Sequence, residues 1–279
     1  MFTKAAALTA LTSAVLATFA VAAPAQAGTA ATTALPTANM EAVLKAAQID
    51  PRRADDTQTP GAHDSVLLVE QALEAKGLLA GEYVDGYFGT TTITAYSAYQ
   101  KSLGYTGIDA SGLPGKTSLE KLGESRYTVT NPVSAGSQVT YHGKTLNTRT
   151  KAMLVAAEGK AGFQVTLTQG SYNPGGVDAS AGTHDGGGAM DISVSGLSST
   201  TRTNLLKALR AVGFAAWYRT PAQGFEYHIH AMAISDPDLS SGAQHQTGDY
   251  YLGMNGLAGR GADDGPSVPK VTWEEYQRG

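Results

Sequence analysis

Cysteine is absent from this chain of 279 residues. Disulfides therefore cannot stabilise the fold, and its stability must come from a buried core, with or without help from a metal. An excess of positive charge is also absent, because 20 Lys and Arg stand against 24 Asp and Glu, a formal net charge of −4. This net charge gives no signature of polyanion binding, so we do not expect a nucleic-acid partner.

Long apolar runs are lacking except at the N-terminus. Lys4 precedes an Ala- and Thr-rich apolar run, 5–23, which is followed by the small-x-small sequence Ala-Gln-Ala at 25–27. This layout is typical of a secretory signal peptide spanning 1–27, with cleavage after Ala27. A transmembrane anchor is the alternative, but the Ala- and Thr-rich composition favours export. No later stretch reaches the roughly 20 apolar residues that cross a bilayer, so we expect a secreted chain free of the membrane.

The rest of the sequence divides into a small folded block and a larger one, as its length allows. Residues 28–62 are Ala/Thr-rich and then Pro- and charge-bearing, which predicts a linker with one short helix at 40–47. The folded blocks are predicted at 63–124 and 127–257, and a Gly/Pro/Asp-rich tail at 258–279.

The first block shows three short helical patterns, at about 66–76, 92–103 and 117–122. Apolar residues recur at spacings of three and four, as at Val66, Val69 and Leu73, and glycines separate the segments. The periodicity predicts a small, mostly helical module. A plain helical spacer would show the same pattern.

A resemblance narrows the interpretation of this block. It is carried by Val66-Leu67-Leu68-Val69-Glu70-Gln71-Ala72-Leu73, Gly77-Leu78-Leu79 and, most specifically, Asp85-Gly86-Tyr87-Phe88-Gly89-Thr90. These segments resemble the type-1 peptidoglycan-binding domain. The resemblance implies a three-helix fold with peptidoglycan as partner. Most of the matched residues are structural, so the resemblance does not say which ones contact the wall.

The second block mixes strands with helices. Alternation of bulky and polar residues predicts strands at 163–168, 191–194, 215–218 and 227–234. Helices are predicted after Thr148, as an N-cap, and at 205–212, and Thr272 is expected to cap a last helical turn. This order favours an α+β fold with an antiparallel sheet.

Two short motifs of this block carry potential metal ligands. His184 and Asp191 are separated by a glycine-rich stretch, which can bend and bring an imidazole and a carboxylate together. In a strand, His228 and His230 point the same way, about 6.6 Å apart, and Glu226 would share that face. Two imidazoles and a carboxylate, with a fourth position for water, are typical of catalytic zinc. The alternatives are a surface His-x-His and an ordinary glycine loop.

A second resemblance adds to this reading. The motif His184-x-x-Gly187-x-Ala189-x-Asp191 is similar to the metal motif of the D-Ala-D-Ala carboxypeptidase and hedgehog-like metallopeptidases, and 217–231 resembles their second motif. The resemblance implies that His184, Asp191 and His230 bind Zn²⁺ and that His228 stabilises the oxyanion. It implies zinc-dependent hydrolysis of a peptide bond in the peptidoglycan stem or crossbridge, without a covalent intermediate.

The sequence departs from that family at two positions. The family's general base often stands three residues before the last histidine, where this chain has Tyr227; we assign the base to the neighbouring Glu226. The family's carboxypeptidases carry a substrate-anchoring arginine where this chain has Asn173, after Tyr172. We keep Tyr172 and Asn173 as substrate-binding candidates. Asparagine cannot form the bidentate contact of an arginine with a carboxylate, which favours an endopeptidase or a weakened enzyme.

Three functions therefore compete. The first is a secreted, wall-associated zinc peptidase, expected to be a monomer and targeted by its binding module. The second is a wall-binding protein whose zinc is not catalytic. The third, a hedgehog-like domain that holds a protein partner, is disfavoured because a wall-binding module suits a wall substrate.

Overall fold

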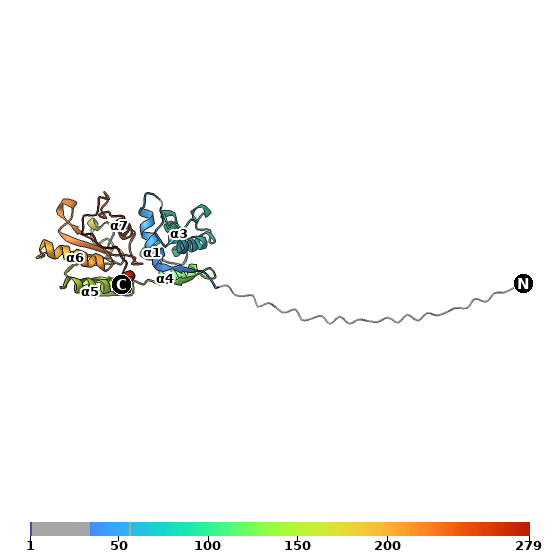
Figure 1. Ribbon diagram of the computed structural model, residues 1–279, viewed down its shortest axis with the longest axis horizontal. Helices are drawn as coiled ribbons and strands as arrows, with labels where there is room; N and C mark the ends of the chain where they lie inside the picture. Colours follow the sequence, from blue (N-terminus) through green and yellow to red (C-terminus); the bar gives the residue numbers. More distant parts are fainter. Residues whose placement is uncertain (2–33, 56) are drawn as a thin grey trace. The chain divides into compact units, whose positions relative to one another are not determined.

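The computed structural model describes Met1 and residues 34–55 and 57–279. The predicted signal peptide thus lies outside the described residues, apart from Met1. Residues Leu35–Gly279 form one unit that mixes helices with antiparallel sheet, which is compatible with the predicted α+β class (Figure 1). Among the described helices, none combines the length and apolar character needed to cross a membrane.

The main sheet has four antiparallel strands, in the spatial order β5-β6-β8-β7. Their bounds are β5 (Leu167–Gln169), β6 (Ala189–Ser193), β7 (Phe214–Arg219) and β8 (His228–Ala233). All four lie near the predicted strands, but β5 begins four residues later than its alternation suggests. Before them a hairpin of β3 (Gln138–Tyr141) and β4 (Lys144–Asn147) leads into the first helix of this region.

The two faces of this sheet have different surroundings. Ile192, Ile229 and Phe214 are fully buried in an apolar cluster with residues of α5 (Thr148–Ala161) and α6 (Ser199–Ala211). Successive strand residues point to opposite faces. Asp191, His228 and His230 therefore project from the other face. Ala215 and Met232 on that face are buried in a second apolar cluster, so only part of it carries polar residues.

Both of these helices begin differently from their prediction. The N-cap of α5 is Asn147 rather than Thr148, because the Asn147 side chain accepts a hydrogen bond from the backbone N–H of Thr150. Helix α6 begins six residues before the predicted 205, because Ser198 caps it through the N–H of Thr201. Its first turn is polar, so the apolar periodicity did not reveal it.

The predicted helical module contains α2 (His63–Glu74), α3 (Thr90–Ser102) and α4 (Lys116–Leu122), joined by short 3-10 turns, η2 (Gly81–Tyr83) and η3 (Gly107–Ala110). The helices lie where the periodicity places them. The turn before α3 is held by Glu70 of α2. Its buried carboxylate accepts hydrogen bonds from the backbone N–H groups of Asp85 and Gly86 and from the Thr92 hydroxyl.

Glu70 gives this module a testable pH dependence. Burial raises the pKa of its carboxyl from 4.5 to about 7. A raised pKa means that the folded state holds the proton more tightly, so the free energy of unfolding falls as pH rises from about 4.5 to about 7. Glu70→Gln, which cannot ionise, should lack this fall, which amounts to up to about 3 kcal/mol in the wild type.

Urea unfolding of both proteins at several pH values measures this difference. Glu74→Gln, which removes an exposed carboxylate from the same helix, is the matched control and should keep the wild-type slope. Parallel pH profiles for the wild type and Glu70→Gln would contradict the prediction.

The segment predicted as a linker is instead part of the fold from Leu35 onward. It contains β1 (Thr37–Asn39), α1 (Met40–Ile49) and η1 (Asp50–Arg52), and β1 pairs in parallel with β2 (Thr128–Thr130). Met40, Val43 and Leu44 of α1 are fully buried. The helix predicted at 40–47 is present as α1, but the linker prediction is wrong for this segment. Its apolar content is low overall and is concentrated on one face of this helix.

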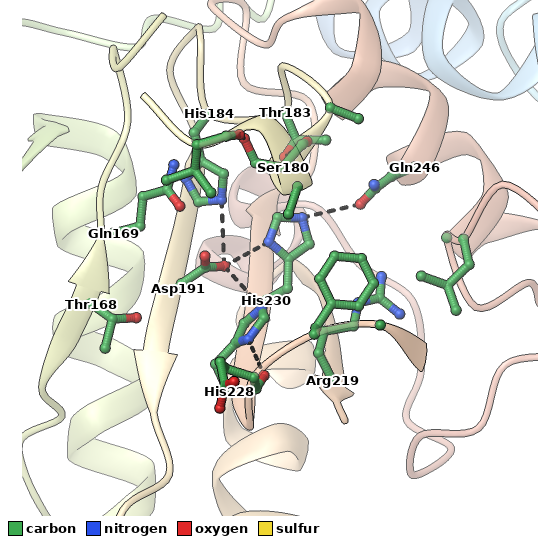
Figure 2. A pocket seen from close by; sticks show the side chains of 18 of the residues that line it. Thr168, Gln169, Ser180, Thr183, His184, Asp191, Arg219, His228, His230 and Gln246 are labelled. Atoms are coloured by element: carbon green, nitrogen blue, oxygen red, sulfur yellow. Dashed lines mark hydrogen bonds and ion pairs between the residues drawn. The ribbon is translucent and has the colours of Figure 1, made fainter. Parts of the chain in front are cut away.

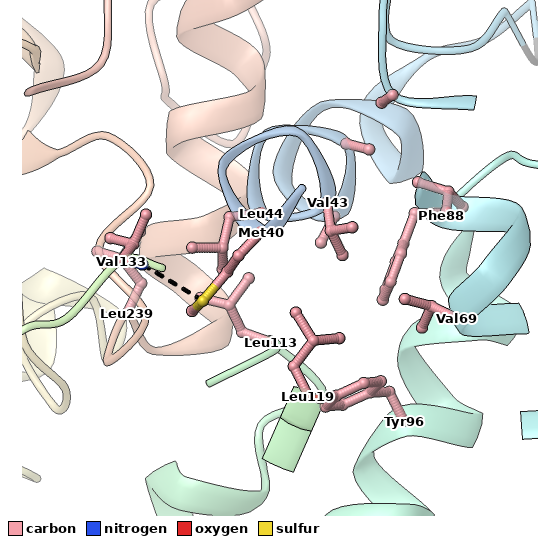
Figure 3. Packing of buried hydrophobic residues seen from close by; sticks show 14 of the residues in the cluster. Met40, Val43, Leu44, Val69, Phe88, Tyr96, Leu113, Leu119, Val133 and Leu239 are labelled. Atoms are coloured by element: carbon pink, nitrogen blue, oxygen red, sulfur yellow. Dashed lines mark hydrogen bonds between the residues drawn. The ribbon is translucent and has the colours of Figure 1, made fainter. Parts of the chain in front are cut away.

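Helix α1 packs between the helical module and the region of the metal motifs. Figure 3 shows Val43 facing Val69 and Phe88 of the module, and Leu44 near Leu239. Helix α1 also contacts α7 (Ser241–Tyr251). A single apolar cluster therefore joins the two predicted blocks.

The C-terminal tail ends in a short helix, α8 (Trp273–Arg278), which packs against the rest of the unit. Thr272 caps it in a capping box with Glu275, as predicted. The buried Arg149 of α5 makes a bidentate ion pair with Glu274, and Lys45 of α1 pairs with Glu275. The last helix is thus tied to two distant parts of the chain.

Candidate metal centre

Three side chains predicted as metal ligands converge in the structure. Ligand atoms of His184, Asp191 and His230 all lie within 4.8 Å of one another, a geometry that could hold a metal ion. Asp191 Oδ1 is 2.7 Å from His230 Nδ1 and 3.4 Å from His184 Nε2. Figure 2 shows the imidazoles turned toward this carboxylate.

Neighbouring strands and a tight loop create this arrangement. Asp191 on β6 and His230 on β8 are direct cross-strand partners, so their side chains rise side by side from the same face. His184 arrives from the glycine-rich loop before β6. A Cβ at Gly186 would lie 2.2 Å from the Asp238 carbonyl oxygen, and Gly188 has φ +79°. The glycines therefore allow close packing and the turn that His184 needs.

The hydrogen bonds of His184 leave a nitrogen that suits a cation. Its Nδ1 lies 2.8 Å from the Gly170 carbonyl oxygen, which can only accept, so Nδ1 carries the proton. Nε2 then presents a lone pair toward Asp191, and it is buried without a hydrogen-bond partner. A lone pair facing a carboxylate is unfavourable unless a positive charge lies between them, which a metal ion would supply.

His230 also has a ring nitrogen whose lone pair faces the Asp191 carboxylate. Its Nδ1 faces Asp191 Oδ1, and its Nε2 lies 3.1 Å from Gln246 Oε1 on α7. Burial lowers the pKa of this imidazole to about 4, so it is neutral near pH 7 and has one N–H for two acceptors. With Nε2–H donated to Gln246, the Nδ1 lone pair is free for a metal. Gln246 then fixes the tautomer, as outer-shell partners of ligating histidines do.

The carboxylate of the group is held in its charged form. Burial alone would raise the pKa of Asp191, but its contacts with the imidazoles of His184 and His230 more than offset this and keep the pKa well below its usual range. Near pH 7 the Asp191 carboxylate is therefore charged and the His230 imidazole is neutral, the forms that bind metals.

His228 also points at the same carboxylate. Its Nδ1 lies 2.7 Å from the Glu226 carbonyl oxygen, and its Nε2 lies 3.6 Å from Asp191 Oδ1. The Nδ1 proton is therefore fixed by the backbone. Neutral His228 offers a lone pair to the centre, whereas protonated His228 offers an N–H donor, the form that stabilises an oxyanion.

Glu226 was assigned as the general base because it was expected to share a strand face with His228 and His230, but it does not lie in the strand. Strand β8 begins at His228, and Glu226 lies in the preceding turn with an exposed side chain. It still lines the same cavity as the metal group. Asp191 and Glu226 are the two carboxylates among the residues that line this cavity.

The structure separates Tyr172 and Asn173 from the metal group. The Tyr172 hydroxyl donates a 2.6 Å hydrogen bond to Asp238, and Asn147 donates to the same hydroxyl. The backbone N–H of Asn173 donates to the carbonyl oxygen of His184. Neither residue lines the cavity around the metal group, so both act on the loop that carries His184 rather than facing a substrate there.

The cavity above the metal group has a volume of about 810 Å³. Apolar side chains such as Val177, Phe225 and Leu257 form much of its wall. Tyr227, with 58 % of its surface exposed, stands at the cavity and stacks on Tyr218. The metal group is thus open to a ligand larger than water, as a catalytic site requires.

Gln169, Arg219 and Gln246 are among the polar residues of this cavity that the sequence did not predict. Gln169 and Arg219 come from β5 and β7, the two outer strands, and Gln246 comes from α7. Arg219 lies within the segment 217–231 that resembles the second motif, and Gln169 and Gln246 lie outside both motifs. The sequence pattern singles out none of the three, because their position at the cavity depends on strand register and on the packing of a distant helix. Comparisons with known protein families, with curated proteins and with solved structures found no match for the chain.

Proposed function

We propose that this protein is a zinc-dependent peptidase that cleaves peptide bonds of bacterial peptidoglycan, delivered to the wall by its helical module. The observation that carries the proposal is the convergence of imidazole nitrogens of His184, His228 and His230 on the Asp191 carboxylate, at an open cavity. Support for the wall as substrate comes from the resemblance of residues 63–124 to peptidoglycan-binding domains.

The donor set favours zinc. Two imidazoles and one carboxylate, from His184, His230 and Asp191, with space above them, suit catalytic zinc with its three protein ligands. Bound zinc lowers the pKa of a coordinated water to about 7 and polarises a carbonyl oxygen.

The remaining residues supply binding and proton transfer. We assign proton transfer to Glu226, which would accept a proton at its carboxylate and return it to a leaving amine, because it is the one carboxylate among the residues lining the cavity outside the proposed ligands. Protonated His228 can donate from Nε2 to an oxygen that gains negative charge. Gln246 holds the ring of His230, and the apolar wall excludes water from part of the cavity.

A second candidate is a wall-binding protein with zinc but without turnover. The exposed position of Glu226, in a turn before β8, favours it, because an exposed carboxylate is not preorganised for proton transfer. The two candidates share the metal and differ in hydrolysis.

The decisive experiment incubates the mature chain, from Gly28 onward, with isolated peptidoglycan, with and without a chelator. We expect new muropeptides, detected by mass spectrometry, that disappear with the chelator and return when zinc is restored. The fragment masses identify the bond that is cleaved. Glu226→Gln is expected to retain zinc and to lose at least about a hundredfold in rate, the scale of general acid–base catalysis.

Other outcomes separate the candidates. Stoichiometric zinc and wall binding without any new fragment would establish the non-catalytic protein. Fragments that persist with the chelator would refute a metallopeptidase. Loss of only a terminal D-Ala would show that a carboxypeptidase works here without an arginine at position 173.

A further inference from the structure

Arg219 lies beside the metal group, within the segment 217–231 that resembles the second motif, but the sequence analysis assigns it no role. It is the last residue of β7, and its cross-strand partner on β8 is His228. Trp217 and Arg219 share the face of the sheet that carries His228 and His230, since their pairs are in register. In Figure 2 Arg219 lies beside His230, on the side away from Asp191.

The guanidinium group is buried but incompletely paired. Arg219 is 2 % exposed, and its Nη1 donates to the Asn255 carbonyl oxygen at 2.8 Å. Its Nη2 is buried without a hydrogen-bond partner, although the side chain lines the cavity. In the described part of the chain, no carboxylate forms an ion pair with it. Leaving a charged donor buried and unpaired is costly, and a ligand bound in the cavity would remove that cost.

The Arg219 guanidinium keeps its positive charge although it is buried. Burial lowers the pKa of Arg219 to about 10, which still leaves the guanidinium protonated near pH 7. It also packs against the Trp217 ring, with its guanidinium carbon 5.0 Å from the ring centre, which restricts its orientation. The Arg219 guanidinium is therefore charged, buried from solvent and fixed in orientation.

The charges of the cavity favour an anion. Its charged lining residues are Asp191, Glu226 and Arg219. With a divalent metal bound, the three positive charges of metal and arginine exceed the two carboxylates by one. A neutral peptide would leave the Arg219 charge uncompensated, whereas a carboxylate would pair with it.

We propose that Arg219 is the anion-binding residue of this cavity and that the peptide substrate carries a free carboxylate close to the scissile bond. The inference rests on the proposed function, because it places the scissile bond at the metal group. Arg219 would then fill, from a different strand, the anchoring role that Asn173 cannot perform. Its unpaired Nη2–H and the planar guanidinium suit a carboxylate better than a neutral amide.

The test compares three acetylated D-alanyl dipeptides by calorimetry on the zinc-loaded mature chain. One has a terminal carboxylate, one a terminal amide, and one a terminal amide with a side-chain carboxylate supplied by D-glutamate. We expect one of the two acids to bind about 10- to 100-fold more tightly than the neutral amide, the range for charged hydrogen bonds. Which acid binds identifies the source of the carboxylate.

Arg219→Gln should remove this preference and leave the affinity for the neutral amide within about twofold. Arg219→Lys should retain part of it, because lysine keeps the charge but not the planar fork. Arg202→Gln is the matched control: it removes an arginine that stacks on Tyr218 outside the cavity, and it should keep the full preference.

Equal affinity of the wild type for all three peptides would overturn the inference. A preference that survives in Arg219→Gln would also overturn it, because the metal would then be holding the carboxylate. If Arg219→Gln does not fold, an undiminished preference in Arg219→Lys would have the same consequence. The zinc content of the chain tests the proposed function. Titration of the metal-free chain with the same peptides tests the role of Arg219, since Arg219 should favour the acid even without zinc.

Discussion

Replacing His184 by alanine is expected to abolish stoichiometric zinc binding. The fully buried His184 Nε2 has no hydrogen-bond partner and faces Asp191, so it is the nitrogen best placed as a ligand. Loss of outer-shell partners alone costs 10- to 100-fold in metal affinity, so loss of a ligand should raise the Kd for zinc by more than about a hundredfold. Zinc per chain after dialysis, measured by elemental analysis, gives the result, and wall hydrolysis should fall with it.

His245→Ala is the matched control for this substitution. His245 lies on α7, one residue before Gln246, but its side chain is exposed and does not line the cavity of the metal group. It should bind zinc as the wild type does. One zinc per chain in His184→Ala would show that the converging histidines are not the metal site.

Replacing Leu44 by alanine is expected to destabilise the whole unit by about 2–5 kcal/mol, the usual cost of emptying a buried leucine site. Leu44 is fully buried in α1, in the apolar cluster that joins the helical module to the region of α7 and Leu239. Urea unfolding of the mature chain measures the change.

Leu35→Ala provides the comparison within the same segment. Leu35 is 42 % exposed, so the same truncation should change the free energy of unfolding by less than about 0.5 kcal/mol. Equal, small effects of the two substitutions would mean that residues 35–62 behave as the linker that their composition suggests.

The packing of α1 also bears on the metal centre. Helix α1 contacts α7, and α7 carries Gln246, whose Oε1 lies 3.1 Å from His230 Nε2. The segment that joins the two blocks therefore supports the helix that orients a proposed metal ligand. A loosened α1 should weaken zinc binding as well as stability, which Leu44→Ala allows to be measured in the same samples.

The sequence by itself determined the features that depend on neighbouring residues. The glycine spacing between His184 and Asp191 and the alternation of His228 and His230 predicted a shared site, because loop bending and strand pleating are local. The periodicity of the first block located three helices for the same reason. The α+β class followed from the order of these local signals.

The tertiary structure alone decided the features that depend on distant residues. Arg219 and Gln246 reach the cavity through strand register and helix packing, which no short window of sequence encodes. Glu226 was assigned to a strand face, but β8 begins two residues later, at His228. The helix at 40–47 was predicted, but its segment was assigned to a linker, because the partners that bury Met40, Val43 and Leu44 lie far away in the sequence. Burial is a property of the assembled core, so only the folded chain reveals it.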